Sequence, residues 1–157
     1  MTAESGPKPA LLVSACLLGV CCNHRGQASS SDAVAALAST HHLVGLCPET
    51  AGGLPTPRPA AEIQSDGRVR TESGDDVSDA YRRGAEAAVS LAKALGATRA
   101  VLKARSPSCG NREVYDGTFQ RRLRPGEGIT AAALRAAGVD VVSEEDVPSG
   151  MLVDPGA

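Results

Sequence analysis

The apolar residues of this 157-residue chain fall into short runs that alternate with helical patterns. Four runs, mostly of Val, Leu and Ala, predict buried strands because each is brief and bounded by turn residues. They span residues 11–15, 42–46, 98–103 and 139–142. From Ser78 to Leu95 the apolar residues recur at i, i+3, i+4 and i+7, which predicts an amphipathic helix that ends before Gly96. Shorter helices are predicted from Asp32 and over residues 130–137, with Thr130 as the cap of the second.

The alternation of strands and helices predicts a mainly parallel sheet with helices on both faces. We therefore expect an α/β fold, a small Rossmann-like or flavodoxin-like three-layer sandwich. One hairpin is expected around Asp66-Gly67, and residues 114–123 are expected to be irregular or to form another hairpin over Asp116-Gly117. Residues 48–59 hold four prolines and two glycines, so they are expected to form a stiff, shaped loop over the sheet edge.

Composition and charge narrow the classes of function. Aromatic residues make up 2% of the chain and the formal net charge is −2, so no base-stacking or phosphate-binding surface for nucleic acid is expected. No apolar stretch approaches the roughly 20 residues that a membrane helix needs. Residues 1–10 lack the features of a secretory signal and are expected to be a flexible tail before a single domain at 11–157. We therefore expect a cytoplasmic protein with reduced cysteines and no nucleic-acid or membrane partner.

Cysteines stand just past the ends of predicted strands. Cys16, Cys47 and Cys109 each follow a different strand, the last after a Ser-Pro-Ser turn. Because parallel strands end at the same edge of a sheet, where α/β folds bind ligands, the three thiols are expected to converge. The alternative is that each is a small buried residue, the usual role of an isolated cysteine. No Cys-x-x-Cys pair is present, so shared thiolate ligation favours an iron–sulfur cluster or zinc over a thioredoxin-like site.

Longer motifs surround these cysteines. They are Val13-Ser14-Ala15-Cys16-Leu17-Leu18-Gly19, Cys47-Pro48-Glu49, Gly52-Gly53-Leu54-Pro55-Thr56-Pro57-Arg58, Ser106-Pro107-Ser108-Cys109-Gly110 and Tyr115-Asp116-Gly117-Thr118-Phe119. In sequence and order they resemble a bacterial family of thiouracil desulfidases, once described only as a domain of unknown function. The resemblance covers the chain from Leu11 to Asp146. Where relatives often have a Tyr-Asp-Gly-like stretch, this chain reads Asn23-His24-Arg25-Gly26, which leaves the identity of the substrate open.

The resemblance implies a [4Fe-4S] cluster with three protein ligands and one iron open to the sulfur of the substrate. The implied ligands are Cys16, Cys47 and Cys109. It also implies a catalytic pair of Glu49 and one serine of the Ser106-Pro107-Ser108 turn, with Ser106 as the first choice. Arg58 and Cys22 are expected near the substrate, a salt bridge being the alternative for Arg58, and Cys21 is interpreted as incidental.

The activity that the resemblance implies is a non-redox hydrolysis of the carbon–sulfur bond in a thiolated nucleobase such as thiouracil. The open iron would polarise the thiocarbonyl group, Glu49 would act as general base, and hydrosulfide would be released through the iron. The substrate would be a small thiolated pyrimidine base or nucleoside. The alternative is a sulfur carrier or sensor that binds a cluster or zinc without turnover, in which Glu49 would be dispensable. The pattern predicts no particular oligomeric state.

Overall fold

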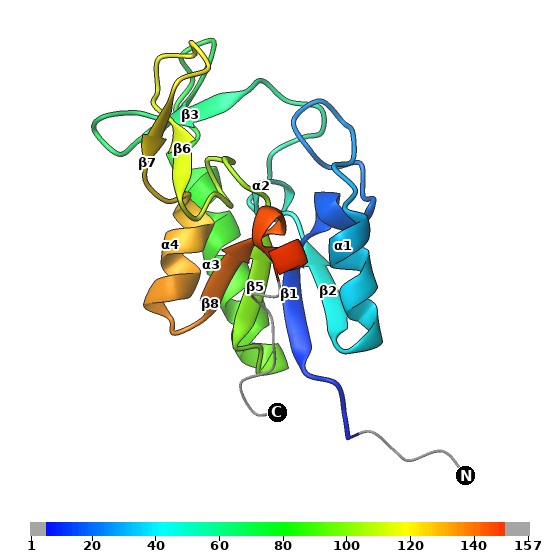
Figure 1. Ribbon diagram of the computed structural model, residues 1–157. Helices are drawn as coiled ribbons and strands as arrows, with labels where there is room; N and C mark the ends of the chain where they lie inside the picture. The colour runs from blue at the N-terminus through cyan, green and yellow to red at the C-terminus, as the bar shows by residue number, and fades with distance from the viewer. Residues whose placement is uncertain (1–5, 150–157) are drawn as a thin grey trace.

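The computed structural model describes residues 6–149, so the outer parts of the expected tail and of the expected domain lie outside the described residues. The central sheet consists of β1 (Ala10–Ser14), β2 (His42–Leu46), β5 (Arg99–Leu102) and β8 (Asp140–Ser143). All neighbours in the sheet are parallel, in the spatial order β2-β1-β5-β8 (Figure 1). Counted along the chain within this sheet, the order is 2-1-3-4, which is the flavodoxin-type arrangement and confirms the expected α/β class.

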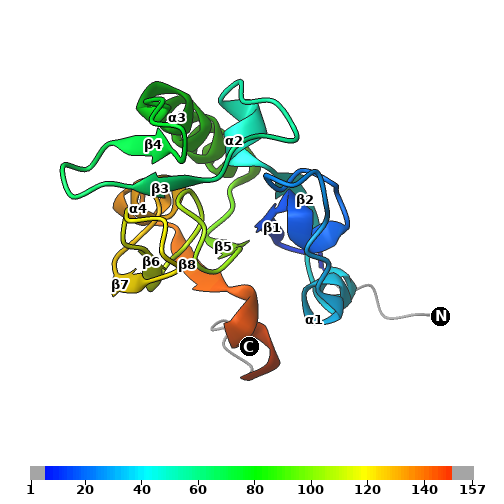
Figure 2. The ribbon, with the colours of Figure 1, turned by 90° about the horizontal axis from the view of Figure 1, so that it is seen from above.

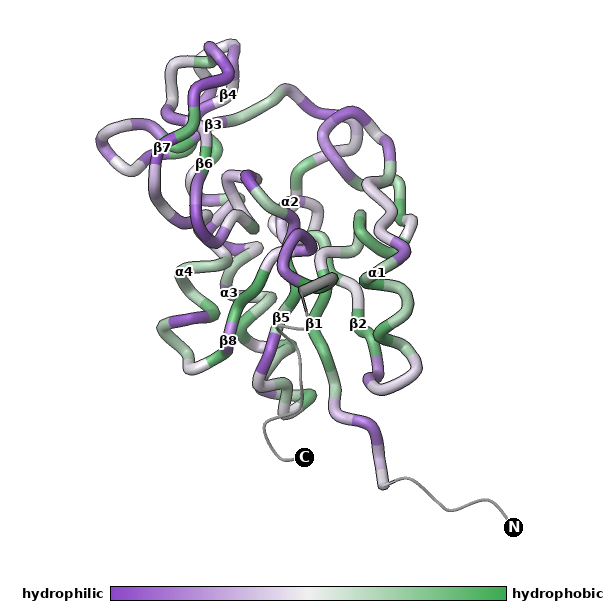
Figure 3. The backbone as a smooth tube through the Cα atoms, in the orientation of Figure 1, coloured by the Kyte–Doolittle hydropathy of each residue, from purple (hydrophilic) through white to green (hydrophobic). Residues whose placement is uncertain are grey.

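Helices cover both faces of the sheet and complete the three layers (Figure 2). One face carries α3 (Ser78–Leu95) and α4 (Ile129–Ala136), and the other carries α1 (Asp32–Ala35) and the 3₁₀ turns Ala36–Ser39 and Glu144–Ser149. Alternate residues of β1 enter the two cores, since Leu12 packs with α3 and α4 whereas Leu11 and Val13 pack with α1. In Figure 3, β1 and much of β5 are coloured as apolar, whereas the hairpins and loops above the sheet are mostly hydrophilic. Within residues 6–149, no helix is both long and apolar enough to cross a membrane.

Two hairpins stand over the carboxyl edge of the sheet (Figure 1). The first pairs β3 (Ala61–Ile63) with β4 (Val69–Thr71) around the predicted Asp66-Gly67 turn. The second pairs β6 (Glu113–Tyr115) with β7 (Leu123–Pro125), so a hairpin is the correct alternative here. A third apolar cluster joins both hairpins to α3. Its buried members are Ile63, Val69, Tyr81 and Val114.

Short helical turns occupy places where the sequence predicted loops or strand ends. Residues 48–59 begin with α2 (Pro48–Ala51), a single turn of helix, instead of forming a loop throughout. Proline is tolerated at the first helical position because its missing N–H would have no intrahelical partner there. A 3₁₀ turn, Ala15–Leu18, follows β1, so Cys16 lies in a turn and not directly after a strand.

Two glycines let α2 pack directly on α3. A Cβ atom on Gly52 would lie 1.9 Å from the carbonyl oxygen of Ala80, and one on Gly84 would lie 2.0 Å from that of Pro48. Contacts this short with backbone atoms cannot be relieved by rotating a side chain, so both positions require glycine. The backbone that follows Cys47 is thereby fixed against the long helix.

The start of α4 differs from the prediction. Gly128, and not Thr130, occupies the cap position, and the helix begins at Ile129. A Cβ atom on Gly128 would lie 2.4 Å from the carbonyl oxygen of Ser108, so glycine allows this close approach. The hydroxyl of Thr130 lies 2.8 Å from that of Ser108. The first residues of α4 therefore brace the turn that carries Cys109.

Replacing Gly84 with Ala should lower the free energy of unfolding by about 1–3 kcal/mol, because the new methyl group would overlap the Pro48 carbonyl. At an unobstructed helix position, Gly→Ala raises the free energy of unfolding by ~1 kcal/mol, so a decrease at Gly84 would show that the methyl group meets an obstacle. Urea unfolding of Gly84→Ala is compared with Ser90→Ala, at an exposed position of α3, which should stay within about 0.5 kcal/mol of the parent. A Gly84→Ala protein as stable as the parent would contradict this packing.

Candidate functional site

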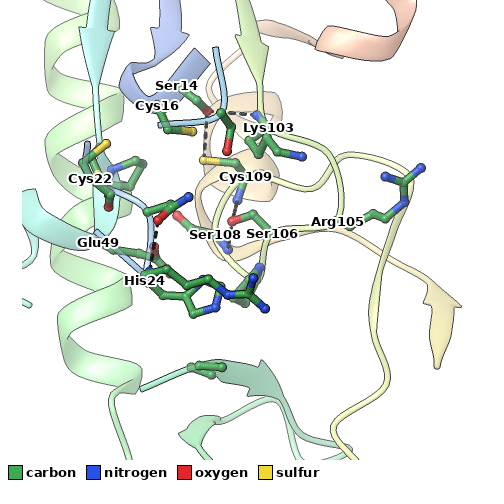
Figure 4. A pocket seen from close by; sticks show the side chains of 18 of the residues that line it. Ser14, Cys16, Cys22, His24, Glu49, Lys103, Arg105, Ser106, Ser108 and Cys109 are labelled. Atoms are coloured by element: carbon green, nitrogen blue, oxygen red, sulfur yellow. Dashed lines mark hydrogen bonds between the residues drawn. The ribbon is translucent and has the colours of Figure 1, made fainter. Parts of the chain in front are cut away.

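The carboxyl ends of β1, β2 and β5 open into one cavity of about 500 Å³. It lies between β1 and β5, where the connections leave in opposite directions and where open α/β sheets bind ligands. Cys16, Cys47 and Cys109 all line it, so the structure brings together the three thiols that the topology predicted to converge. Figure 4 shows Cys16 and Cys109 close to one another, with Glu49 on the wall of the same space.

Each of the three thiols is held by a different local structure. Cys16 lies in the 3₁₀ turn after β1, which ends at Gly19 with a left-handed φ of 93°. Cys47 occupies the cap position of α2, directly after β2. Cys109 follows β5 in the turn that the start of α4 braces, and only 4% of its surface is exposed. Three separate segments of the chain therefore fix the thiols, with no pair on one helix.

A hydrogen-bond donor stands at each of these three sulfur atoms. The donors are Ser29 at Cys16, Arg58 at Cys47 and Ser14 at Cys109. Ser14 Oγ lies 3.2 Å from Cys109 Sγ, and Arg58 Nη2 lies 4.0 Å from Cys47 Sγ. Such donors stabilise negative charge on sulfur and tune the potential of a cluster whose thiolates they contact. The surroundings therefore suit three thiolate ligands.

Three ionised cysteines in this cavity would need a positively charged partner, because burial and their mutual repulsion disfavour the thiolate form. Burial raises the pKa of the Cys109 thiol to about 12, and the Ser14 hydroxyl opposes this shift. Burial, and then the charge of Cys47, raises the pKa of Cys16. A bound metal cation would lower these raised pKa values, because a thiol that coordinates a metal loses its proton.

The spacing of the donors bears on the kind of metal group. Among residues 6–149, no three His, Cys, Asp or Glu side chains lie close enough together to hold a single metal ion. A cluster places each thiolate on a separate iron, so its ligands stand further apart than those of one ion. Three cysteine thiols on separate segments are a donor set that suits such a cluster.

Both carboxylate oxygens of Glu49 have a buried donor. Arg58 Nη2 lies 2.5 Å from Glu49 Oε2, and the hydroxyl of Tyr81 donates to Glu49 Oε1. Burial and then the charge of Glu49 raise the pKa of Tyr81 far above its usual range, so its hydroxyl remains a donor. Each oxygen keeps a further lone pair for a water molecule in the cavity. Tyr81 was missed by the sequence interpretation, which placed it only on the packing face of the long helix.

Arg58 is placed differently from our expectation that it contacts the substrate. Its side chain is 4% exposed and forms the ion pair with Glu49, so the salt-bridge alternative matches the structure. Its other hydrogen bonds run to the backbone carbonyls of Cys22 and Pro55 and to the hydroxyl of Thr56. Burial is the largest single influence on the pKa of Arg58 and lowers it. The charge and hydrogen bond of Glu49, together with the charges of Cys47 and Tyr81, outweigh burial, so the pKa lies above its ordinary value. Arg58 therefore stands behind the cavity wall as a fixed cation between Glu49 and Cys47.

The two serines of the Ser-Pro-Ser turn have different surroundings. Ser106 Oγ lines the cavity and accepts hydrogen bonds from the backbone N–H groups of Ser108 and Cys109, at 3.1 and 3.0 Å. These contacts leave the Ser106 hydroxyl available as a donor toward the cavity. Ser108 is 1% exposed and its hydroxyl is paired with Thr130. The geometry therefore favours Ser106 over Ser108 as the reactive serine.

Cys22 and the loop around it form another part of the cavity wall. The Cys22 thiol is buried, contacts Cys47, and has its pKa raised to about 12 chiefly by burial. The next residues, Asn23 to Arg25, also line the cavity. Asn23 Oδ1 accepts hydrogen bonds from two backbone N–H groups of its own loop, which fixes the shape of the segment. Cys21, in contrast, is exposed.

Comparison with known proteins agrees with this geometry. Residues 11–146 match the sequence model of the 2-thiouracil desulfurase family. The uncharacterized protein YbbK of Bacillus subtilis (strain 168) is 38% identical over 146 residues, which cover 87% of this chain and 97% of YbbK. Among solved structures, the [4Fe-4S]-dependent thiouracil desulfidase TudS is similar with a TM-score of 0.84 and 46% identity, over 90% of this chain and 95% of TudS. The resemblance noted in the sequence is thus confirmed, and the chain belongs to the 2-thiouracil desulfurase family.

Proposed function

We propose that this protein is a [4Fe-4S]-dependent desulfidase that hydrolyses the carbon–sulfur bond of a thiolated pyrimidine without net oxidation or reduction. The observation that carries the proposal is the convergence of three donor-supported thiols and Glu49 on one cavity. Similarity to a [4Fe-4S]-dependent thiouracil desulfidase at 46% identity supports the same activity. The cavity of about 500 Å³ is of a size that takes small molecules, so we infer a free base or nucleoside and not RNA.

In this proposal Cys16, Cys47 and Cys109 hold the cluster. When bound, the cluster would supply an iron without a protein ligand, a Lewis acid for the thiocarbonyl group and a binding position for sulfur. None of the five cysteines forms a disulfide, and a reducing compartment keeps cysteines available as ligands. We therefore place the protein in the cytoplasm, without a membrane or nucleic-acid partner.

Glu49 is the general base of the proposed reaction. Its carboxylate removes a proton from a water molecule, whose oxygen forms the new bond to the ring carbon. The proton that remains on the added hydroxyl passes to sulfur as the carbon–sulfur bond breaks, so the ring keeps the oxygen as a carbonyl and sulfur leaves as hydrosulfide. Glu49 then returns its proton to solvent. Tyr81 and Arg58 keep the two carboxylate oxygens in place, so little reorganisation is needed when the water is bound. Ser106 donates from the opposite turn and orients the water or the ring.

Serine substitutions of the three cysteines should remove the cluster. After anaerobic reconstitution, the parent protein should contain about four iron and four sulfide per chain and absorb visible light, as expected for a [4Fe-4S] cluster. Cys16→Ser, Cys47→Ser and Cys109→Ser should each lose most of this iron and sulfide. Cys21→Ser is the matched control, because its thiol is exposed and should leave both contents unchanged. Stoichiometric zinc without acid-labile sulfide in the parent would contradict the assignment of a cluster.

Replacement of Glu49 by Gln should slow sulfide release from 2- or 4-thiouracil by at least about 100-fold, since the amide cannot accept the proton of water. Gln keeps an oxygen that accepts from Tyr81 or Arg58, so the cluster content should equal that of the parent. Sulfide is measured without added reductant. Glu86→Gln, at an exposed carboxylate of α3, should retain the parent rate. A cluster-loaded Glu49→Gln protein with undiminished sulfide release would favour a mechanism without this base.

A further inference from the structure

The few aromatic side chains of the chain gather at the cavity. The chain contains two tyrosines, one phenylalanine and no tryptophan. Tyr81, Tyr115 and Phe119 all line the cavity. Phe119 is half-buried and belongs to none of the three apolar clusters that form the cores of the described residues. A large apolar ring that adds nothing to a core, yet lines a cavity, is placed for contact with a ligand.

The backbone at Phe119 adopts a conformation that is unfavourable for its side chain. Its φ is +57°, in the left-handed region that glycine, asparagine and aspartate adopt most readily. A bulky residue persists in this region only where its surroundings hold it, and such residues concentrate at ligand sites. Phe119 lies in the loop between β6 and β7, in a hairpin that stands over the carboxyl edge of the sheet.

A buried carboxylate holds this loop in its unfavourable shape. Glu62 on β3 is 9% exposed, and its Oε1 accepts hydrogen bonds from the backbone N–H groups of Gly117 and Phe119, at 3.0 and 3.1 Å. Gln64 adds a hydrogen bond from its amide to the carbonyl oxygen of Gly117, at 3.2 Å. The first hairpin thus fixes the loop of the second, and Phe119 with it.

We propose that Phe119 determines specificity by stacking its ring on the plane of the pyrimidine, with Glu62 as its positioning residue. The proposal rests on the proposed function for the class of ligand, a planar heterocycle with an accessible π face. Phenylalanine has no polar group, so its ring contributes only apolar and stacking contacts, and stacking on aromatic side chains is a common means of holding a base. The cysteines and Glu49 lie at the sheet edge, whereas Phe119 lies on the hairpin side. A ring bound between them would have its thiocarbonyl directed toward the thiols.

The test uses two ligands that differ in planarity. Uracil and 5,6-dihydrouracil carry the same carbonyl and N–H groups, but the dihydro ring is puckered and lacks the π face. Calorimetric titration of the anaerobically reconstituted protein should show tighter binding of uracil, by about tenfold. Phe119→Leu, which keeps an apolar side chain, should abolish this preference, and Phe119→Tyr should retain it. If Phe119 had a purely structural role, its replacement would weaken the binding of uracil and of 5,6-dihydrouracil by the same factor.

Glu62 and a neighbour in the loop complete the set of variants. Glu62→Ala should reduce the preference for uracil as Phe119→Leu does, and Glu62→Gln, which keeps an acceptor oxygen, should restore most of it. Gln120→Leu is the matched control, since this exposed residue adjoins Phe119 without lining the cavity.

The outcomes separate this inference from the proposed function. Uracil binding is measured without turnover, so a protein that binds uracil selectively but releases no sulfide from thiouracil would sink the proposed activity and leave the stacking role standing. Three results would overturn the role of Phe119. They are an equal loss of affinity for both ligands in Phe119→Leu, an unchanged preference for uracil in that variant, and no uracil binding by the parent protein. In the steady state, Phe119→Leu should raise KM for 2-thiouracil about tenfold with little change in kcat, because the ring acts on binding.

Discussion

Parallel pairing of β1 with a neighbour on each side is the constraint on which the site depends. The register places Ser14 opposite Leu46 on β2, so the two strands end at the same level. A slip of one residue would turn the side chains of β1 to the opposite faces, which both cores forbid. Ser14 also links this edge to the turn after β5, since its hydroxyl donates to Cys109 and accepts from the backbone of Lys103. Three thiols from distant parts of the chain meet because the sheet permits no other alignment.

Charge is arranged around this edge so that the proposed base, Glu49, and a proposed cluster ligand, Cys47, share one supporting group, Arg58. One guanidinium nitrogen of Arg58 donates to Glu49, lies near the sulfur of Cys47, and binds the carbonyl of Cys22. Truncating Arg58 would leave the Glu49 carboxylate buried without its charge partner, at a cost of about 3–5 kcal/mol, whereas Glu49→Gln keeps an acceptor for the guanidinium group. The proline-rich segment that carries Arg58 therefore holds the carboxylate of Glu49 from behind the wall of the cavity.

The sequence predicted the sheet, the first hairpin and the convergence of the cysteines, because these follow from apolar runs, turn residues and strand topology. It left the second hairpin as one of two alternatives. It did not predict α2, since a single helical turn that begins with proline has little intrinsic propensity and forms here by packing on α3. It preferred Ser106 to Ser108 but could not decide between them, because the difference is tertiary: the hydroxyl of Ser108 is buried against that of Thr130, 22 residues further along the chain. The contacts of Tyr81 and Arg58 with Glu49 are likewise tertiary, so no local pattern reveals them.

The central claim is that three cysteines hold a cluster whose remaining iron faces Glu49. A crystal structure of the anaerobically reconstituted protein, with iron located by anomalous scattering, tests it most directly. Our account predicts a cubane bonded to the sulfur atoms of Cys16, Cys47 and Cys109, with its fourth iron open to the cavity on the side of Glu49. A single metal ion at this edge, or a fourth iron bound by the thiol of Cys22, would contradict it.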